Sequence, residues 1–262
     1  MPISIDDGNA ARGGRTGQAS LRALAVAPRN AAIVIPTYNE LDNIPKLVAT
    51  VLGLYPDIHI LVVDDHSPDG TSDAVRELQN SHANLMLLER MQNPGFAASY
   101  RDGFRKVMAE PWCHAVITMD ADFSHNPVEV RQMLEKLAGR DIAVGSRYTS
   151  GGSVKNWNLP RRMLSRAANF YVRAVLGMPI HDTTSGFLCM RREALEGVPV
   201  HTTVSEGYAF LVELKYLLRH SGSQFVEHPI IFDERREGES KMSAGKVWES
   251  FWMPWRIRWR SR

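Results

Sequence analysis

The sequence predicts an α/β protein with a doubly wound, mostly parallel sheet flanked by helices. Short apolar runs that stop at acidic or turn residues are typical of strands buried on both faces of a parallel sheet. Helical patterns lie between these runs, and strands that alternate with helices build a doubly wound sheet. The expected strands are 31–36, 59–65, 85–90, 115–122 and 141–147.

Four helices are expected between these strands. They begin near Leu41, at Thr71, after Gly95 and at Pro127. Pro127 follows Asn126, and a proline at the first helical position behind a capping residue is a good helix start. The chain then divides into a flexible, Gly-rich segment at 1–30, a globular domain at 31–243 and a Trp/Arg-rich tail at 244–262.

Composition narrows the function classes. The 262 residues are 44% hydrophobic and 23% charged, which is ordinary for a soluble globular protein. A net charge of +2 is too small to argue for a nucleic-acid partner. No apolar run approaches the ~20 residues of a membrane-spanning helix. The N-terminus lacks the pattern of a secretion signal, so a cytoplasmic location is expected.

The usual dinucleotide-binding, P-loop and structural-zinc signatures are absent. The sequence has no GxGxxG and no GxxxxGK[ST]. Its two cysteines, Cys113 and Cys189, form no CxxC pair, which argues against structural zinc and suits a reducing compartment. Any nucleotide is therefore expected to bind in another way.

The apolar run at 115–119 ends on Asp120 and Asp122, two carboxylates that repel each other when both are ionised. Helix capping and solvent exposure would explain one such pair. The acidic pair Asp64–Asp65 and Glu40 follow other strands, and the carboxyl ends of parallel strands share one sheet edge. This concentration favours a hard divalent cation bound with a nucleotide diphosphate.

The combination of motifs resembles the family 2 glycosyltransferases, and most of all the polyprenol-phosphate (dolichol-phosphate) mannosyltransferases. The resemblance covers about 33–243. The motifs, in order, are IPTYNE (35–40), VVDDHSPDGT (62–71), MDADFSHNP (119–127), GSRYTSGG (145–152), TTSGFLCMRREAL (183–195) and FDERREGESKMS (232–243).

The resemblance implies a GT-A fold, a need for Mg²⁺ or Mn²⁺, and inverting transfer of mannose from GDP-mannose to a polyprenyl monophosphate. It assigns Asp120, Ala121 and Asp122 to the diphosphate and metal. Ser124 stands where some relatives have a glutamine that reaches the metal; serine is shorter, so His125 or water could substitute. The positions implied for the guanosine part are Pro36, Tyr38, Glu40, Val63 and Asp65.

The resemblance also implies where the acceptor binds. Arg147 and Arg161 align with positions that bind the acceptor phosphate, and Ser165 lies one turn beyond Arg161. A forked guanidinium suits a phosphate. Arg235 and Lys241 resemble residues of a loop that closes over the donor diphosphate, with Arg192 a further candidate. Asp182 and Glu206 lie in matching segments and are compatible with a structural role.

The chemistry of phosphate acceptors and of metal-bound diphosphates agrees with these assignments. A phosphate acceptor is already ionised at neutral pH, so no strong general base is required. A divalent ion acts as a Lewis acid on the leaving diphosphate. Asp122 and Arg147 are therefore the expected catalytic residues, acting by positioning and charge stabilisation.

Two segments are candidates for contact with a membrane, where a polyprenyl acceptor resides. In 160–178, Met163, Ala167, Phe170 and Ala174 recur at helical spacing, either as an interfacial face or as a face packed on the sheet. In the tail, tryptophans recur among Lys and Arg, which suits a membrane interface or a membrane-embedded partner; core packing is the alternative. These are Trp248, Trp252, Trp255 and Trp259.

Other functions stay open at this point. A polyprenyl-phosphate glucosyltransferase, or another enzyme that uses a UDP-sugar, would keep the same sheet and the same aspartates. A non-catalytic nucleotide-sugar-binding scaffold predicts loss of the Asp120–Asp122 pair or of the 232–243 motif, and both are intact. A nucleic-acid-binding module is disfavoured because basic residues gather at the tail, without a stripe of stacking aromatics.

Overall fold

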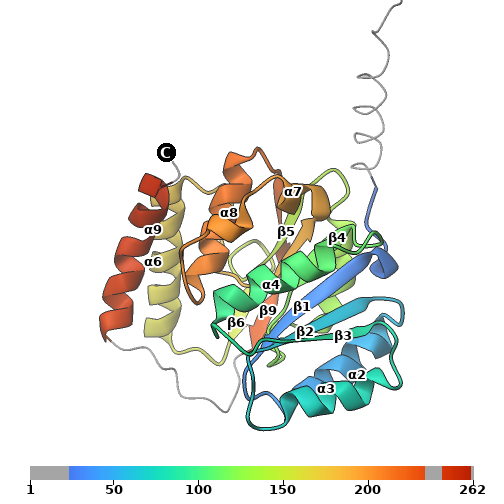
Figure 1. Ribbon diagram of the computed structural model, residues 1–262. Helices are drawn as coiled ribbons and strands as arrows, with labels where there is room; N and C mark the ends of the chain where they lie inside the picture. Colours follow the sequence, from blue (N-terminus) through green and yellow to red (C-terminus); the bar gives the residue numbers. More distant parts are fainter. Residues whose placement is uncertain (1–23, 234–243, 261–262) are drawn as a thin grey trace, which may run out of the picture.

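The computed structural model describes residues 24–233 and 244–260 and contains a seven-stranded sheet in the order β3-β2-β1-β4-β7-β5-β8 (Figure 1). β7 is antiparallel to both of its neighbours, and every other pairing in this sheet is parallel. The mostly parallel, doubly wound prediction is confirmed. The strands are β1 Ala31–Thr37, β2 His59–Asp64, β3 Leu85–Glu89, β4 Ala115–Thr118, β5 Ile142–Ser146, β7 Leu188–Arg191 and β8 Phe225–Pro229.

Helices cover both faces of the sheet. One face packs against α2 (Ile44–Leu54), α3 (Thr71–Gln79) and α5 (Val130–Glu135). The other packs against α4 (Phe96–Met108) and α8 (Ala209–His220), and α6 (Leu159–Leu176) and α9 (Ala244–Arg260) lie side by side at the edge of this layer (Figure 1). The remaining elements are α7 Arg192–Glu196, the 3₁₀ turns η1 Pro28–Asn30, η2 Pro127–Glu129 and η3 Val200–Thr202, and a two-stranded sheet of β6 Ser153–Lys155 and β9 Ile231–Asp233.

The central strands are apolar on both faces because both faces are covered. Along β1, Ile33 and Ile35 belong to the core shared with α2, whereas Ala32 and Val34 belong to the core shared with α4. All four side chains are fully buried. This alternation explains why the strand has a continuous apolar sequence instead of one that alternates with polar residues.

Capping residues fix several helix starts. The Asn126 side chain accepts a hydrogen bond from Val128 N at 3.1 Å, and Asn158 accepts one from Arg161 N at 3.0 Å. Pro127 therefore begins a 3₁₀ turn that leads into α5, as a proline behind a cap predicts. The first predicted helix begins at Ile44 instead of near Leu41, with a proline in its first turn.

The globular part begins earlier than the sequence predicts. Residues 24–30 were expected to belong to a flexible segment, but Val26 is buried in the core beneath β1 and Pro28–Asn30 forms a 3₁₀ turn. The Leu24 carbonyl also accepts a hydrogen bond from the Arg191 guanidinium. Val26 lies in the short apolar stretch 23–27, which is too brief to establish a helix or strand period, so its burial was not predictable from the pattern. The rest of the predicted flexible segment lies outside the described residues.

The described helices were searched for membrane spans. None of them combines the length and the apolar character needed to cross a bilayer.

A substitution in α4 tests the close packing of this helix on the sheet. A Cβ added at Gly103 would lie 2.7 Å from Val34 Cγ1 and 3.1 Å from Val63 Cγ2. We expect Gly103→Ala to lower the free energy of unfolding by about 1–3 kcal/mol, measured by urea denaturation, because the core must shift to admit a methyl group. Gly53→Ala in α2 is the control, since a Cβ there meets nothing within 4 Å and alanine favours a helix. Equal stability changes for the two variants would contradict this packing.

Candidate functional site

The carboxyl ends of the parallel strands form one edge of the sheet, and strained turns are concentrated there. Asn39, His66, Asn93 and Phe123 follow β1, β2, β3 and β4, and all four have positive φ angles between 52° and 61°. Left-handed backbone is uncommon outside glycine, above all for a bulky residue such as phenylalanine. Strain of this kind is characteristic of ligand-binding edges.

The chain turns sharply between Asp120 and Ser124. Asp122 Oδ1 accepts a hydrogen bond from Ser124 N at 3.0 Å, and Phe123 takes its left-handed conformation between them. Asp120 and Asp122 are only half-buried, whereas Ala121 is buried between them. The turn therefore holds both carboxylates at the solvent boundary of the sheet edge.

His125 supports this turn from below. It is buried and stacked on Phe187, with ring centroids 4.8 Å apart, and its Nδ1 accepts a hydrogen bond from Asp120 N at 3.0 Å. Burial lowers the pKa of His125, against the raising effect of Asp120 and Asp122. A neutral imidazole with an accepting Nδ1 carries its proton on Nε2, which lies 3.9 Å from Asp120 Oδ2. Neither ring nitrogen therefore offers a lone pair to a metal, so His125 does not substitute for a ligand.

The donor set fits a hard divalent cation. Carboxylate oxygens are the ligands that Mg²⁺ and Mn²⁺ prefer, and Mg²⁺ commonly takes only one or two carboxylates beside water and phosphate. Across 24–233 and 244–260, no cluster of three His, Cys, Asp or Glu side chains forms a protein-only metal site. Asp120 and Asp122 would therefore hold the ion together with the diphosphate and water. The Ser124 side chain stays a predicted ligand; its observed contribution is the backbone bond to Asp122.

The two acidic residues after β2 are held in place by other groups. Asp64 is fully buried and accepts hydrogen bonds from Thr37 Oγ1 at 2.7 Å, Ser67 Oγ at 2.6 Å and Ser72 Oγ at 2.8 Å. Asp65 Oδ2 accepts a bond from Gly95 N at 2.7 Å, and its Oδ1 pairs with Arg90. Through these hydrogen bonds and the ion pair, both carboxylates stabilise the loops that follow β1, β2 and β3.

The residues predicted to hold the guanosine part lie together at the ends of β1 and β2. Pro36 and Val63 are paired in the register of these strands, with Val63 fully buried and Tyr38 exposed. Glu40 N donates to Thr71 Oγ1 at 3.0 Å, which ties the turn after β1 to the start of α3. The structure thus brings these residues and Asp65 to one place, and their role in binding a nucleotide stays a prediction.

Arg147 follows β5 and is held by a buried carboxylate. Asp182 Oδ2 accepts bonds from Arg147 N at 2.9 Å and Nε at 2.7 Å, and Asp182 Oδ1 accepts one from Nη2 at 2.7 Å. Burial opposes the charge of Arg147, but the bonds and charge of Asp182 raise its pKa above the usual arginine value. In the part of the chain that the structure describes, no acceptor is bonded to Nη1, so this edge of the guanidinium suits an anion.

The other two predicted acceptor residues lie beside Arg147. Trp157 lies between two arginines, with its ring centre 5.8 Å from the Arg147 guanidinium carbon and 4.5 Å from that of Arg161. Ser165 Oγ accepts a hydrogen bond from the Tyr148 hydroxyl at 2.6 Å. The structure therefore gathers Arg147, Arg161 and Ser165 around two aromatic rings, and both arginines contribute cation–π contacts.

The segment 182–187 joins the two halves of this edge. Because β7 is antiparallel, the loop before it reaches the same edge as the carboxyl ends of its neighbours. At one end Asp182 holds Arg147; at the other, Gly186 O accepts a bond from Thr118 Oγ1 at 2.5 Å and Phe187 stacks on His125. The segment 182–187 thus contacts Arg147 at one end. At the other end it contacts Thr118 and His125, which adjoin the aspartate pair.

Sequence reasoning missed most of this framework. Asn169 of α6, which was not predicted, accepts bonds from Thr183 Oγ1 and Thr184 N, both at 3.0 Å. A buried asparagine in an otherwise apolar helix stripe is the signal that could have identified it, since such a group needs a partner. Asp182 has the structural role that the sequence left open for it, since it holds Arg147.

One predicted donor residue among those that the structure describes does not join the site. Arg192 lies after β7, at the opposite edge of the sheet, where it donates to Glu110 O at 2.8 Å and pairs with Glu196 at 2.6 Å. Its prediction as a diphosphate ligand is wrong because antiparallel β7 carries it away from the carboxyl ends of β4 and β5. Arg235 and Lys241 lie outside the described residues. Glu206 is exposed and pairs with Arg101 at 3.6 Å.

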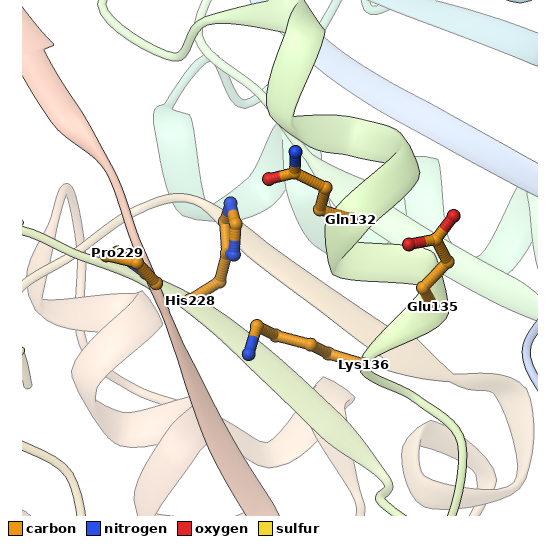
Figure 2. A pocket seen from close by; sticks show the side chains of 5 residues that line it. All are labelled: Gln132, Glu135, Lys136, His228 and Pro229. Carbon is orange, nitrogen blue, oxygen red and sulfur yellow. The ribbon is translucent and has the colours of Figure 1, made fainter. Parts of the chain in front are cut away.

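A shallow cavity lies between α5 and β8 (Figure 2). It is lined by Gln132, Glu135, Lys136, His228 and Pro229, none of which is a predicted site residue. His228 Nε2 is bonded to Glu129 at 2.7 Å across this gap.

Comparison with known proteins gives the family. The model of glycosyl transferase family 2 matches residues 32–198, which is more than half of the chain. The chain belongs to glycosyl transferase family 2. A polyprenol monophosphomannose synthase from Mycolicibacterium smegmatis is 41% identical over 232 residues, 87% of each chain. An undecaprenyl-phosphate mannosyltransferase from Micrococcus luteus is 36% identical over 83% of this chain and 89% of its own.

A more distant relative and two solved structures extend the comparison. A dolichol-phosphate mannosyltransferase from Pyrococcus furiosus is 33% identical over 83% of this chain and 60% of its own. Glucosyl-3-phosphoglycerate synthase from Mycobacterium tuberculosis has a TM-score of 0.60 at 17% identity, covering 98% of this chain and 83% of its own. A Pyrobaculum calidifontis mannosyltransferase, solved with GDP-Man and Mn²⁺, has a TM-score of 0.55 at 19% identity, covering 88% and 68%. Both solved structures share the fold of this family 2 glycosyltransferase.

The ion pair that fixes Arg147 gives a stability test. Asp182 is fully buried, so Asp182→Asn leaves Arg147 with an uncompensated buried charge. We expect the free energy of unfolding to fall by about 3 kcal/mol, measured by urea denaturation. Asp73→Asn, which breaks a surface pair with Arg76, is the control and should change stability by less than about 1 kcal/mol. A similarly small loss for Asp182→Asn would show that the pair does not hold the site together.

Proposed function

We propose that this chain transfers mannose from GDP-mannose to a polyprenyl monophosphate, inverting the anomeric carbon to give polyprenyl β-mannosyl phosphate and GDP. The observation that carries the proposal is one sheet edge on which a carboxylate pair and an arginine pair are joined by the segment 182–187. The carboxylate pair fits a metal-bound diphosphate, and the arginine pair fits a phosphate acceptor. Mannose and polyprenyl phosphate are supported by the names of relatives 33–41% identical to the chain.

Each half of the edge has a distinct task. Arg147 and Arg161 bind the acceptor phosphate and orient one of its oxygens toward the sugar, since guanidinium groups hold phosphate with directed bonds. The acceptor is ionised before it binds, and the proposal assigns His125 to holding the turn at Asp120 without any role as a base. Positioning and charge stabilisation therefore account for the chemistry.

The donor occupies the other half. Pro36, Tyr38, Glu40, Val63 and Asp65 receive the guanosine part, and Arg235 and Lys241, which lie outside the described residues, are the proposed further ligands of the diphosphate. Asp120 and Asp122 hold Mg²⁺ or Mn²⁺. That ion, when bound, neutralises the diphosphate as GDP leaves. Asp122 is a catalytic residue in this proposal because it places the cation at the leaving group.

A UDP-sugar transferase is the second candidate, since a solved structure of the same fold contains uridine-diphosphate-glucose. The test is sugar transfer by purified protein in detergent with a polyprenyl monophosphate and radiolabelled GDP-mannose or UDP-glucose. The proposal requires label from GDP-mannose in an organic-extractable, mild-acid-labile product, and loss of that label with a chelator. Transfer from UDP-glucose alone would overturn mannose as the sugar. Transfer from neither donor would overturn the activity and leave a binding scaffold.

A substitution at the turn tests the metal assignment. Asp122→Asn removes one of the two carboxylate charges proposed to hold the ion. We expect Mn²⁺ affinity in the presence of GDP, measured by electron paramagnetic resonance, to fall by about tenfold or more, and transfer to fall in parallel. Asp73→Asn serves as the matched control, because its exposed carboxylate pairs with Arg76 on α3 and is not a predicted site residue. Undiminished Mn²⁺ binding by Asp122→Asn would remove this residue from the metal site.

A membrane-facing surface accompanies the acceptor site. The stripe predicted on α6 is exposed along its whole length, with Met163 64% and Phe170 73% accessible. Leu159 and Leu164 extend it, and Arg161 and Arg166 are exposed on the same helix. Because Arg161 of this helix borders the phosphate site, the apolar face is placed to meet the lipid chain.

The tail helix α9 adds aromatic and basic groups beside α6 (Figure 1). Trp259 is 63% exposed and Trp252 is 42% exposed, with Arg256 and Arg260 exposed nearby. Trp255 is partly buried against the core, which follows the packing alternative for that residue. The Trp248 side chain lies outside the described residues. We propose that α6 and the exposed residues of α9 hold the enzyme peripherally on the cytoplasmic face of a membrane.

Vesicle binding checks this surface. The double substitution Met163→Ser and Phe170→Ser should weaken co-sedimentation with anionic phosphatidylglycerol vesicles by at least about tenfold, since it removes two large apolar groups from the face. Met91→Ser, at an exposed methionine after β3, should leave binding unchanged. Equal binding by both variants would contradict the surface. Loss of binding to pure lipid by the wild type as well would favour a membrane-embedded partner protein.

A further inference from the structure

Lys215 is a buried cation that the proposed reaction does not yet use. It lies on α8, it is fully buried, and its Nζ donates to Ser185 O at 2.6 Å. A lysine without access to water is rare and costly unless its charge has a use. Its acceptor belongs to the segment 182–187 that joins the two halves of the site.

Lys215 reaches Arg147 through a short chain of contacts. Ser185, whose carbonyl it binds, donates its own hydroxyl to Gly145 O at 2.6 Å, two residues before Arg147. Three residues before Ser185, Asp182 forms the ion pair with Arg147. The buried ammonium is therefore attached to the same short segment that positions the acceptor arginine.

Charge is the second reason for a role in the site. Arg147 and Asp182 together carry no net charge, which is a poor electrostatic site for a phosphate. Lys215 restores a positive charge beneath this pair. The charged groups that act on it are Asp182, which raises its pKa, and Arg147, which lowers it; burial is the largest effect and lowers the pKa to about 7. Glu213 on the same helix is occupied by Val204 N and Ser205 N.

We propose that Lys215 is a positioning residue for the acceptor phosphate: its ammonium fixes the segment 182–187 and supplies the positive charge that the Arg147–Asp182 pair lacks. The inference rests on the proposed function and adds a residue to its acceptor site. Since Lys215 is buried, it acts through Ser185 and through its field on the phosphate, without touching the substrate.

Two neutral substitutions separate the charge from the hydrogen bond. Lys215→Met removes both, and Lys215→Gln keeps an N–H donor for Ser185 O but carries no charge. The probe is a short-chain prenyl monophosphate, and its dissociation constant is measured by calorimetry in detergent, with GDP and Mn²⁺ as a second ligand. We expect Lys215→Met to weaken prenyl phosphate binding by about tenfold and to leave GDP binding unchanged. Lys215→Gln should fall between this variant and the wild type.

The pH dependence supplies a readout that a purely structural role would not change. Between about pH 6 and about pH 8.5, the tighter prenyl phosphate binding of the wild type relative to Lys215→Met should disappear, because Lys215 becomes neutral across this range. The ionisation of the prenyl phosphate itself affects both proteins equally. Unfolding gives a control on the fold. A lysine with a lowered pKa makes the wild type gain stability as pH rises above about 7, and the methionine variant should lack that gain.

The outcomes separate the two proposals. If the wild type does not bind the prenyl phosphate, the proposed function fails. If the wild type binds it and both variants bind it equally well at about pH 6, the role of Lys215 alone is overturned. Equal losses of prenyl phosphate and GDP binding would also overturn it, because they would indicate a general collapse of the site.

Discussion

A buried carboxylate determines how the proposed acceptor site of this enzyme is built. Asp182 has no exposure to solvent and accepts hydrogen bonds from the backbone and the guanidinium of Arg147. Removing two charges from water is expensive, and a pair of this kind contributes little net stability compared with an apolar pair. Its value lies in geometry. An arginine fixed at two guanidinium nitrogens has already lost rotamer freedom, so the proposed binding of a phosphate by Arg147 would cost less entropy.

The segment 182–187 also contacts residues next to the aspartate pair, so it connects the two halves of the site. Within these six residues, Asp182 contacts Arg147, and Ser185 contacts Lys215 on α8. Gly186 contacts Thr118 on β4, and Phe187 stacks on His125. Transfer in a single displacement needs the acceptor oxygen and the departing diphosphate on opposite sides of one carbon, so small errors in their relative position are costly. A short segment between two strands is a more precise connection than two independent loops.

The sequence predicts some of these features well. The strands were predictable because burial on both faces leaves continuous apolar runs. Asp120 and Asp122 became candidates because acidic residues at strand ends gather at one edge, whereas Arg147 became one through the family resemblance; the roles of all three stay predictions. Helical spacing predicted the stripe on α6 but left open whether it packs on the sheet, and the structure exposes it. The packing of Val26, the antiparallel direction of β7 and the position of Arg192 were not predictable from local patterns. The contacts of Asp182 and Lys215 join residues at least thirty positions apart, and no local pattern specifies such a pair.

In the proposed enzyme, the metal held by Asp120 and Asp122 lies close enough to the phosphate held by Arg147 for direct transfer of the sugar between them. Phosphorus NMR of a short-chain prenyl monophosphate, bound to the enzyme with GDP and Mn²⁺, measures this directly, because Mn²⁺ strongly enhances the relaxation of a nearby phosphorus nucleus. We expect strong enhancement for the wild type. We also expect Arg147→Ala to lose this enhancement while Mn²⁺ and GDP stay bound. A prenyl phosphate that binds without enhancement, or an enhancement that persists in Arg147→Ala, would show that the two sites do not lie together as proposed.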